Sequence, residues 1–349
     1  MDVFKKGDVL STKIDLTRDL RIGILDFAPT SKTVAAKRLW ESTGLRRPPD
    51  KSLPLRFPAI CDNCGTFRCD KSLSNEVTLC AVCGSDKKKK GSSQPAVMPI
   101  FGFHGQESDE LPGESRPPRV GSINSYFGDF EGVAPERIPV LVNGKEIFVR
   151  MGKQGLITVL NRGPGGRGFE ICKNCGFGRV HREGGKKKRV SRDEKLEAHP
   201  RPGMSEKTCT SNLSTLFLAH EFLTDTIEIS VPSLVEENEA WSALAALLGG
   251  AHSLGISVRD LSGTIRASGT SGLEKSLIIF DGVPGGAGYS RRLKEQLDEL
   301  FKAGSRIARS CECGEETACY GCLKTFENQS HHEKLSRKSA ISFFEKFTL

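Results

Sequence analysis

Eleven of the twelve cysteines in this 349-residue chain fall into three groups whose spacing suits a metal ion. In the first group, Cys61 and Cys64 form one Cys-x2-Cys pair, Cys80 and Cys83 form a second, and fifteen residues lie between the pairs. Each pair puts two thiolates on one side of a tight turn, and a glycine follows each pair where the chain must curl around the metal. The spacing predicts a zinc ribbon with a closed site of four sulfur ligands. Cys69 lies between the pairs and is interpreted as a bystander.

The last group places four cysteines within twelve residues, at Cys311, Cys313, Cys319 and Cys322. The residues between them are largely polar, so burial in an apolar core does not explain the cluster. In a reducing compartment, four thiolates at this spacing are typical of a structural zinc site.

The middle group is less complete. Cys172 and Cys175 form a pair, and Cys209 supplies a third thiolate. The fourth ligand is then a histidine or water, and both His199 and His181 are near enough in sequence. His199 is favoured, because His181 lies in the run that leads into a basic loop.

All three groups are expected to be structural sites, giving about three Zn²⁺ ions per chain. None of the three groups, with His199 as the fourth ligand of the second, has a separate glutamate in HxE or HExxH spacing to act as a base. A site closed by four thiolates also has no open position for water, so we expect no catalytic metal.

The expected compartment follows from the N-terminus and from hydropathy. The first residues, MDVFKKGDVL, contain no apolar core of a signal peptide. No apolar run reaches the roughly 18 residues that a membrane span requires. The chain is therefore expected to be cytoplasmic, with no membrane partner and with reduced cysteines.

The formal net charge of +8, from 51 Lys and Arg against 43 Asp and Glu, favours a polyanionic partner, most commonly nucleic acid. Basic runs on loops would contact phosphates without reading sequence, although such runs are often only solvated. The candidate nucleic-acid contacts are Lys87, Lys88, Lys186, Lys187, Lys188, Arg189, Arg291 and Arg292.

A glycine-rich segment from Asp281 to Gly288 is expected to follow a strand and to open a helix. Such a turn either packs a helix closely on a sheet or offers its backbone N–H groups to a phosphate, with Arg291 and Arg292 nearby. It is not a Walker A loop, because no Gly-Lys-Ser/Thr follows. A second glycine-rich segment, Gly163 to Gly168, is interpreted as a flexible turn.

The elements around these groups predict a mixed α/β fold (α+β), with a zinc ribbon and an α/β domain that carries the C-terminal cluster of four cysteines. We expect a strand at Leu20–Leu25, a hairpin turning at Asn143-Gly144, and a helix containing Leu293 and Phe301 that Gly304 caps. The predicted segments are a β/α segment (1–57), the ribbon (58–84), linker and loops (85–137), a β-hairpin with the Cys/His region (138–212) and the α/β zinc-binding domain (213–349).

Several of these stretches resemble the C-terminal part of MrfA-type superfamily-2 helicases. The resemblance rests on Asn161–Gly176, on His199 with Cys209, and on Leu218–Asp225. Asp281–Tyr289 and the last cysteine group resemble the MrfA zinc-binding domain itself, which is also found in the DrmB protein of DISARM phage defence. Arg18–Leu45 and the 61–83 ribbon are loosely similar to the segment between motor and zinc domain.

The resemblance implies a zinc-binding accessory module of a DNA helicase. It assigns the family's four zinc cysteines to Cys311, Cys313, Cys319 and Cys322, and it supports His199 over His181. The sequence departs from the family in having no P-loop and no DExx box, so the ATPase would be a partner subunit. A role in bacterial anti-phage defence or DNA repair would follow.

Two alternatives stay open. One is a nuclease or other DNA-processing enzyme that uses the strand–turn–helix at 277–292, with Asp281 or Arg291 in a chemical role. The other is a protein-only adaptor in which the positive charge is incidental. The chain is otherwise expected to have no catalytic motif of its own.

Overall fold

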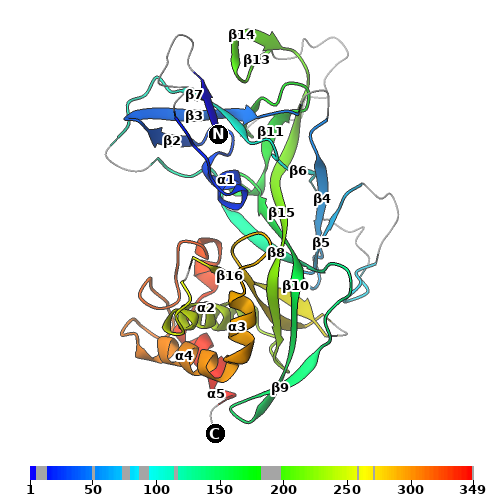
Figure 1. Ribbon diagram of the computed structural model, residues 1–349, viewed down its shortest axis with the longest axis vertical. Coiled ribbons are helices and arrows are strands. Elements are labelled where there is room, and N and C mark those ends of the chain that lie inside the picture. The colour runs from blue at the N-terminus through cyan, green and yellow to red at the C-terminus, as the bar shows by residue number, and fades with distance from the viewer. Residues whose placement is uncertain are drawn as a thin grey trace.

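The computed structural model describes residues 1–4, 14–48, 52–72, 79–85, 94–113, 117–181, 198–257, 259–269 and 272–347. Within these residues, two long antiparallel strands, β10 (Lys145–Asn161) and β15 (Leu213–Ser230), run along much of the molecule (Figure 1). Their pairing extends from Phe148–Ser230 to Asn161–Leu218, with one irregularity between Gly152 and Gly155. Ile227 and Ile229 of β15 are two residues apart, so they point to the same face of the strand, where they belong to the largest buried cluster.

The other strands of an eleven-stranded sheet are added on both sides of this pair, as far as the described residues show. Next to β15 lie β17, β11 and β6, and next to β10 lie β8 and β9. The strands are β4 (Leu55–Ile60), β5 (Phe67–Asp70), β6 (Ala96–Val97), β8 (Ile123–Phe130), β9 (Ile138–Val142), β11 (Phe169–Cys172), β12 (Gly178–Val180), β16 (Leu261–Ser268) and β17 (Glu274–Asp281).

The sheet curls, so that β16 at its end approaches β8. The Thr264 hydroxyl donates to the Ser125 carbonyl at 2.8 Å, and Arg266 donates to Asp129 at 2.8 Å. Phe127 of β8 belongs to the same buried cluster as aromatic and aliphatic residues of β10, β15 and β17. The curl therefore gives the sheet an apolar concave side.

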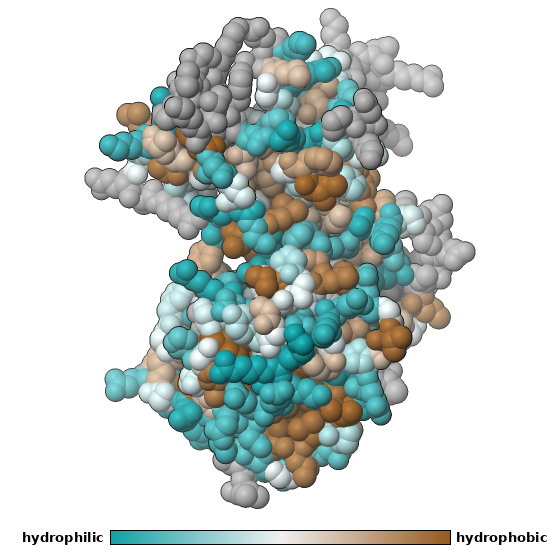
Figure 2. Space-filling view, in the orientation of Figure 1, coloured by the Kyte–Doolittle hydropathy of each residue, from teal (hydrophilic) through white to brown (hydrophobic). Residues whose placement is uncertain are grey.

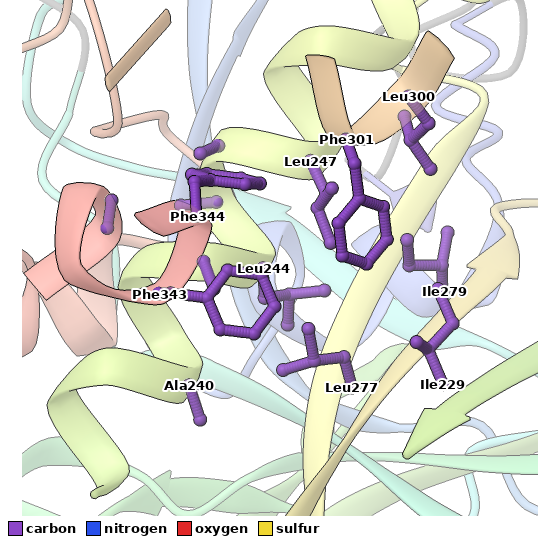
Figure 3. Close-up of a cluster of buried hydrophobic side chains, with 14 of the residues drawn as sticks. Ile229, Ala240, Leu244, Leu247, Leu277, Ile279, Leu300, Phe301, Phe343 and Phe344 are labelled. Atoms are coloured by element: carbon purple, nitrogen blue, oxygen red, sulfur yellow. The ribbon is translucent and has the colours of Figure 1, made fainter. Parts of the chain in front are cut away.

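A helical layer covers the other side of the sheet near the C-terminal end (Figure 1). It contains α2 (Glu237–Ser253), α3 (Tyr289–Glu295), α4 (Leu297–Ser310) and α5 (Arg337–Glu345). Figure 3 shows Phe301 and Leu247 facing the strand residues Ile229 and Ile279, with Phe343 alongside. The outer side of this layer is mostly hydrophilic on the face drawn in Figure 2, as expected for amphipathic helices.

The N-terminal part forms a smaller four-stranded sheet in the order β1-β7-β3-β2, built from β1 (Asp2–Phe4), β2 (Lys32–Ala35), β3 (Arg38–Leu45) and β7 (Phe103–Glu107). A two-stranded hairpin of β13 (His199–Arg201) and β14 (Met204–Cys209) lies near it at the same end of the molecule (Figure 1). None of the helices in the described residues is long and apolar enough to cross a membrane.

The expected mixed α/β fold is confirmed, including the hairpin at Asn143-Gly144. Both residues have positive φ, 47° and 77°, as a two-residue hairpin turn requires. The strand predicted at Leu20–Leu25 is wrong, because this stretch is helix α1 (Leu20–Asp26). The Asp19 side chain accepts the Arg21 N–H at 2.8 Å, and this N-cap favours a helix over a strand.

The prediction that 85–137 is linker and loops is also wrong, since this segment contains β6, β7 and β8. The edge strand β8 alternates poorly, because Ser, Gly and Asp interrupt its apolar residues, and this hid it from a periodicity argument. The eleven-stranded sheet contains strands from all five predicted segments, and the division into segments stays a prediction.

Gly304 does not cap a helix, as the sequence suggested, because α4 continues through it to Ser310. It lies where α4 crosses α2 opposite Gly250. A Cβ on Gly250 would come within 2.8 Å of the Gly304 backbone nitrogen, and a Cβ on Gly304 within 2.7 Å of Phe344. These glycines therefore let the two helices approach more closely than any other residue type would allow.

We expect Gly250→Ala to lower the free energy of unfolding by about 1–3 kcal/mol, because the new methyl group meets backbone that cannot rotate away. Gly23→Ala in α1 is the matched control. Its Cβ would have only ordinary contacts at 3.8 Å, so the change should be neutral or stabilise by up to about 1 kcal/mol. Urea denaturation of both variants measures the difference, and equal effects would refute the close crossing.

Candidate metal centres

The zinc ribbon is made of two knuckles with the same backbone hydrogen bonds. The Gly65 N–H donates to the Cys61 carbonyl at 2.8 Å, and the Gly84 N–H donates to the Cys80 carbonyl at 2.9 Å. Both glycines have positive φ, 77° and 66°, so the conformation itself requires glycine after each Cys-x2-Cys pair. The knuckles face each other and bring the four cysteines Cys61, Cys64, Cys80 and Cys83 together.

The sulfur positions in the ribbon fit a tetrahedral zinc ion. The Sγ atoms of Cys61 and Cys83 are 3.6 Å apart, and so are those of Cys64 and Cys80. Zinc–sulfur bonds of about 2.3 Å in a tetrahedron give sulfur–sulfur edges of about 3.8 Å. The four ligand atoms therefore surround a space of the right size for zinc.

The ribbon is seated on the turn between β16 and β17. A Cβ on Gly272, which has a φ of 69°, would lie 2.9 Å from the Cβ of Cys64 and 3.3 Å from that of Cys83. Ala267 of β16 is buried in the same cluster as the ribbon cysteines. The first metal site is thus packed against the α/β part of the chain, a contact that nothing in the sequence signalled.

The second group combines Cys172, Cys175, Cys209 and His199, which the structure brings together within 4.8 Å. The Sγ atoms of Cys172 and Cys209 are 4.0 Å apart, and the Cys175 Sγ is 3.3 Å from the His199 Nε2. His199 stands directly opposite Cys209 in the β13–β14 hairpin. Its buried ring stacks on Phe177 at a centroid distance of 4.9 Å, which fixes its orientation.

His181, the alternative fourth ligand, lies elsewhere. Its Nδ1 is 3.3 Å from a carboxylate oxygen of Glu170. It is not among the residues that the structure gathers around Cys172 and Cys175. The geometry therefore favours His199, while metal binding by this group stays a prediction.

The third group is the most regular in its distances. Cys311 is 3.5 Å from Cys313 and 3.6 Å from Cys319, and Cys322 is 3.7 Å from Cys313 and 3.8 Å from Cys319, measured between Sγ atoms. These four edges match the edge of about 3.8 Å expected for a zinc tetrahedron. The cluster follows α4 directly, so the helix end fixes its position.

Arg337 ties the third group to the helices and was missed in the sequence. Its buried guanidinium donates to the carbonyls of Ala308, Arg309 and Cys313. Two of these carbonyls belong to the last turn of α4, where a positive charge is stabilised by the helix dipole. No local pattern points to this role, because Arg337 lies fifteen residues beyond Cys322 in sequence.

The surroundings of the clustered thiols shift their pKa values in opposite directions. The Ser85 hydroxyl bonds to Cys83 and lowers the pKa of its thiol to about 5, whereas burial raises the pKa of Cys64 to about 11. In the third group, burial raises the pKa of Cys322 to about 12. Four adjacent thiolates repel one another, so all four ionise together only around a cation.

Cys69 lies outside the three groups, as the sequence suggested. It is on β5, packed against the small apolar cluster of Phe67 and Leu160. Burial and the neighbouring Glu221 carboxylate both raise the pKa of its thiol. A thiol in this setting is protonated and unreactive.

The glycine-rich turn at 281–288 does not offer an open phosphate cradle. Asp281 is fully buried, and its carboxylate accepts the N–H groups of Ala287, Tyr289 and Ser290 at 2.7–3.0 Å. The Ser290 hydroxyl also donates to it at 2.5 Å. Because an internal carboxylate already occupies the N–H groups at the start of α3, close packing explains this turn better than anion binding.

The two arginines after this turn have partners within the fold. Arg291, half-exposed, lies 3.2 Å from the buried carboxylate of Asp225, and Arg292 donates to the Leu254 carbonyl at 2.6 Å. Their contact with nucleic acid stays a prediction. The other candidate contacts, Lys87, Lys88, Lys186, Lys187, Lys188 and Arg189, lie outside the described residues.

Residues 243–323, which end in the third cysteine group, match the family model of the MrfA Zn-binding domain. The expected resemblance to this family is confirmed. The domain match and the three Cys/His groups together support zinc as the cofactor of this chain.

The Druantia protein DruE of Escherichia coli (strain UMEA 4076-1) is 27% identical over 314 residues, which cover 81% of this chain and 16% of DruE. Among solved structures, the DUF1998 helicase MrfA bound to DNA matches with 9% identity and a TM-score of 0.37, over 70% of this chain and 27% of MrfA. A second crystal structure of the DUF1998 helicase MrfA matches with 9% identity and a TM-score of 0.33, over 70% of this chain and 26% of MrfA. The chain thus spans about a sixth of DruE and about a quarter of MrfA.

We expect His199→Ala to lose about one zinc ion per chain, because it leaves three thiolates and an open coordination position. His181→Ala should keep the full zinc content, and Cys69→Ser serves as the matched control among the thiols. Inductively coupled plasma mass spectrometry of the purified variants measures this. Loss of zinc from His181→Ala with retention in His199→Ala would reverse the assignment.

Asp281→Asn should lower the free energy of unfolding by about 1.5–3 kcal/mol, because charge-assisted hydrogen bonds to buried N–H groups are lost. Asp109→Asn removes the same charge at an exposed position and should change stability by less than about 0.5 kcal/mol. Chemical denaturation compares the two. A stability of Asp281→Asn equal to wild type would count against the structural role of this carboxylate.

Proposed function

We propose that this chain is a non-catalytic zinc-binding module that associates with a superfamily-2 helicase-type ATPase in a partner chain and helps to hold DNA. The observation that carries the proposal is the match of residues 243–323 to the MrfA Zn-binding domain, joined to a tetrahedral arrangement of Cys311, Cys313, Cys319 and Cys322. Bacterial anti-phage defence or DNA repair is the proposed setting, and the cytoplasm is the proposed compartment.

The zinc ions, about three per chain, have a mechanical role in this proposal. Each group joins a loop to a different part of the fold: the ribbon to the β16–β17 turn, the Cys/His group to β3, and the last group to the ends of α4 and α5. At β3, the Leu45 N–H donates to the Gly176 carbonyl at 2.8 Å. Zinc held by four protein ligands contributes folding energy without adding chemistry.

Two features support DNA as the partner. The net charge of +8 favours a polyanion, and the matched zinc-binding domain takes its name from MrfA, a helicase that has been crystallised bound to DNA. The ATPase activity in this proposal belongs to the partner, since no P-loop occurs in these 349 residues. Because the chain spans only about a sixth of DruE, the activity of that whole protein is not transferred here.

The nuclease alternative is weakened by the burial of Asp281. Its carboxylate accepts four hydrogen bonds from the following turn and has no exposed surface for a metal or substrate. The protein-only adaptor stays the second candidate, because the helical layer and exposed aromatic side chains such as Tyr320 and Phe326 are also typical of protein interfaces.

The proposed function predicts salt-dependent DNA binding and a stable complex with a motor. In fluorescence anisotropy with duplex and single-stranded oligonucleotides, the chain should bind at about 50 mM salt and weaken at least tenfold by about 200 mM. A superfamily-2 ATPase from the same genome should co-purify with it and should hydrolyse ATP faster when DNA and this chain are both present.

The outcomes separate the candidates. Co-purification with the ATPase but no DNA binding at low salt would leave the adaptor. Metal-dependent nicking that Asp281→Ala abolishes would establish the nuclease instead. If the chain bound no DNA and no motor co-purified with it, the proposal would be overturned.

A further inference from the structure

The second glycine-rich segment, between β10 and β11, forms a hydrogen-bonded turn that the metal centres do not explain. It runs from Arg162 to Gly168 and includes the short helix η2 (Pro164–Gly166). Three backbone hydrogen bonds close it: Gly166 N–H to Gly163, Arg167 N–H to Pro164, and Gly168 N–H to Arg162, at 3.1, 3.3 and 2.7 Å. The turn that the sequence predicted is present, and its flexibility stays a prediction.

The base of this turn is fixed by a buried side chain and by two glycines in contact. Asn161, fully buried at the end of β10, donates to the Ile24 carbonyl and accepts the Gly163 N–H, both at 2.9 Å. A Cβ on Gly163 would lie 2.6 Å from the Gly168 carbonyl oxygen. The two ends of the turn are thus packed against each other and against α1.

The tip of the turn is bare, and two guanidinium groups lie beside it. Gly165 and Gly166 are exposed, and each would bring a Cβ near only one side chain. That side chain is Arg167 for Gly165, at 3.7 Å from its Nε, and Arg162 for Gly166, at 4.0 Å from its Nη2. Two positive charges therefore flank a surface with no side chain of its own.

Arg162 is held in place without a carboxylate. Its guanidinium lies over the ring of buried Phe217, 5.4 Å from the centroid. In the part of the chain that the structure describes, no Asp or Glu forms an ion pair with Arg162, in contrast to Arg291 on Asp225. The aromatic ring packs against this guanidinium, and Arg162 remains exposed.

We propose that the turn Arg162–Gly168 binds the phosphodiester backbone of DNA, with Arg162 and Arg167 donating to phosphate oxygens on either side of the glycine tip. This inference rests on the proposed function and names the part of the chain that holds the DNA. A phosphate at the glycine tip would meet positive charge from both guanidiniums, since one lies beside Gly165 and the other beside Gly166. The planar guanidinium donates two parallel N–H bonds to a phosphate, and the missing side chains at the tip let a backbone approach closely.

The contact is independent of base sequence, since both guanidiniums meet phosphates and nothing at the tip could reach a base edge. The packing of Arg162 on Phe217 also matters. A donor that is already ordered loses less conformational entropy when it binds than an unpacked side chain does.

The test is DNA binding by the full chain carrying Arg162→Gln and Arg167→Gln together. We expect the affinity at about 50 mM salt to fall on the order of tenfold for every sequence, because two phosphate contacts are lost. The slope of log K against log salt should become shallower by about two, since each phosphate contact contributes about one. The matched control is Lys302→Gln with Arg306→Gln on the outer side of α4, which removes the same charge and should change both values little.

A second variant tests the bare tip. Gly166→Asn tolerates the positive φ of 71° but adds a side chain beside Arg162, so it should weaken DNA binding with both arginines intact. Zinc content and thermal unfolding of each variant check that it is folded, and Arg162→Lys with Arg167→Lys should restore the salt slope more than the affinity.

Failure of this inference is distinguishable from failure of the proposed function. Suppose that the wild-type chain binds DNA in a salt-dependent way and that the double glutamine variant has the same affinity and salt slope. The turn would then not be a DNA contact, and the proposed function would still stand. Loss of motor co-purification with unchanged DNA binding would assign the turn to a protein partner instead and also overturn it. No DNA binding by the wild-type chain would overturn both.

Discussion

The antiparallel pairing of β10 with β15 is the constraint on which the described parts of this molecule depend. β15 pairs on its other side with β17 near one end, and with β11 and β6 near the other. The helical layer packs on Ile227 and Ile229 of this strand, and the Cys/His group begins where β11 leaves it. Because both strands contribute to the helical core and to the aromatic cluster inside the curl, a break in their register would disturb both.

The metal groups act at the places where this sheet cannot stabilise the chain by itself. The described turns at 61–65, 80–84, 173–176 and 311–322 have little regular structure, and short turns do not bury enough surface to offset the entropy of ordering them. Zinc bound by four protein ligands would supply that free energy locally. The turns also pack closely on the rest of the fold, as Cys64 does against Gly272 and Gly176 does against Leu45.

The sequence predicts the local features of this molecule better than its long-range ones. The knuckles were predictable because Cys-x2-Cys-Gly needs both the spacing and the positive φ, and Asn143-Gly144 was predictable for the same reason. The register of β10 on β15, the curl that brings Thr264 to Ser125 and the capping of α4 by Arg337 were not. Each of these depends on residues far apart in sequence, whose meeting no local period records.

The two glycine-rich turns show why a local motif does not by itself identify an anion site. Both follow a strand and both have arginines close by, but their surroundings differ in where the negative charge comes from. At 281–288 it is internal, because Asp281 receives the turn's N–H groups and Asp225 pairs with Arg291. At Arg162–Gly168 the N–H groups of the turn bond to neighbouring carbonyls. Arg162 packs on the ring of Phe217 and forms no ion pair with a carboxylate among the described residues. A positive charge that the fold orders but does not neutralise is available to an external phosphate, whereas one that the fold neutralises must first lose its internal partner.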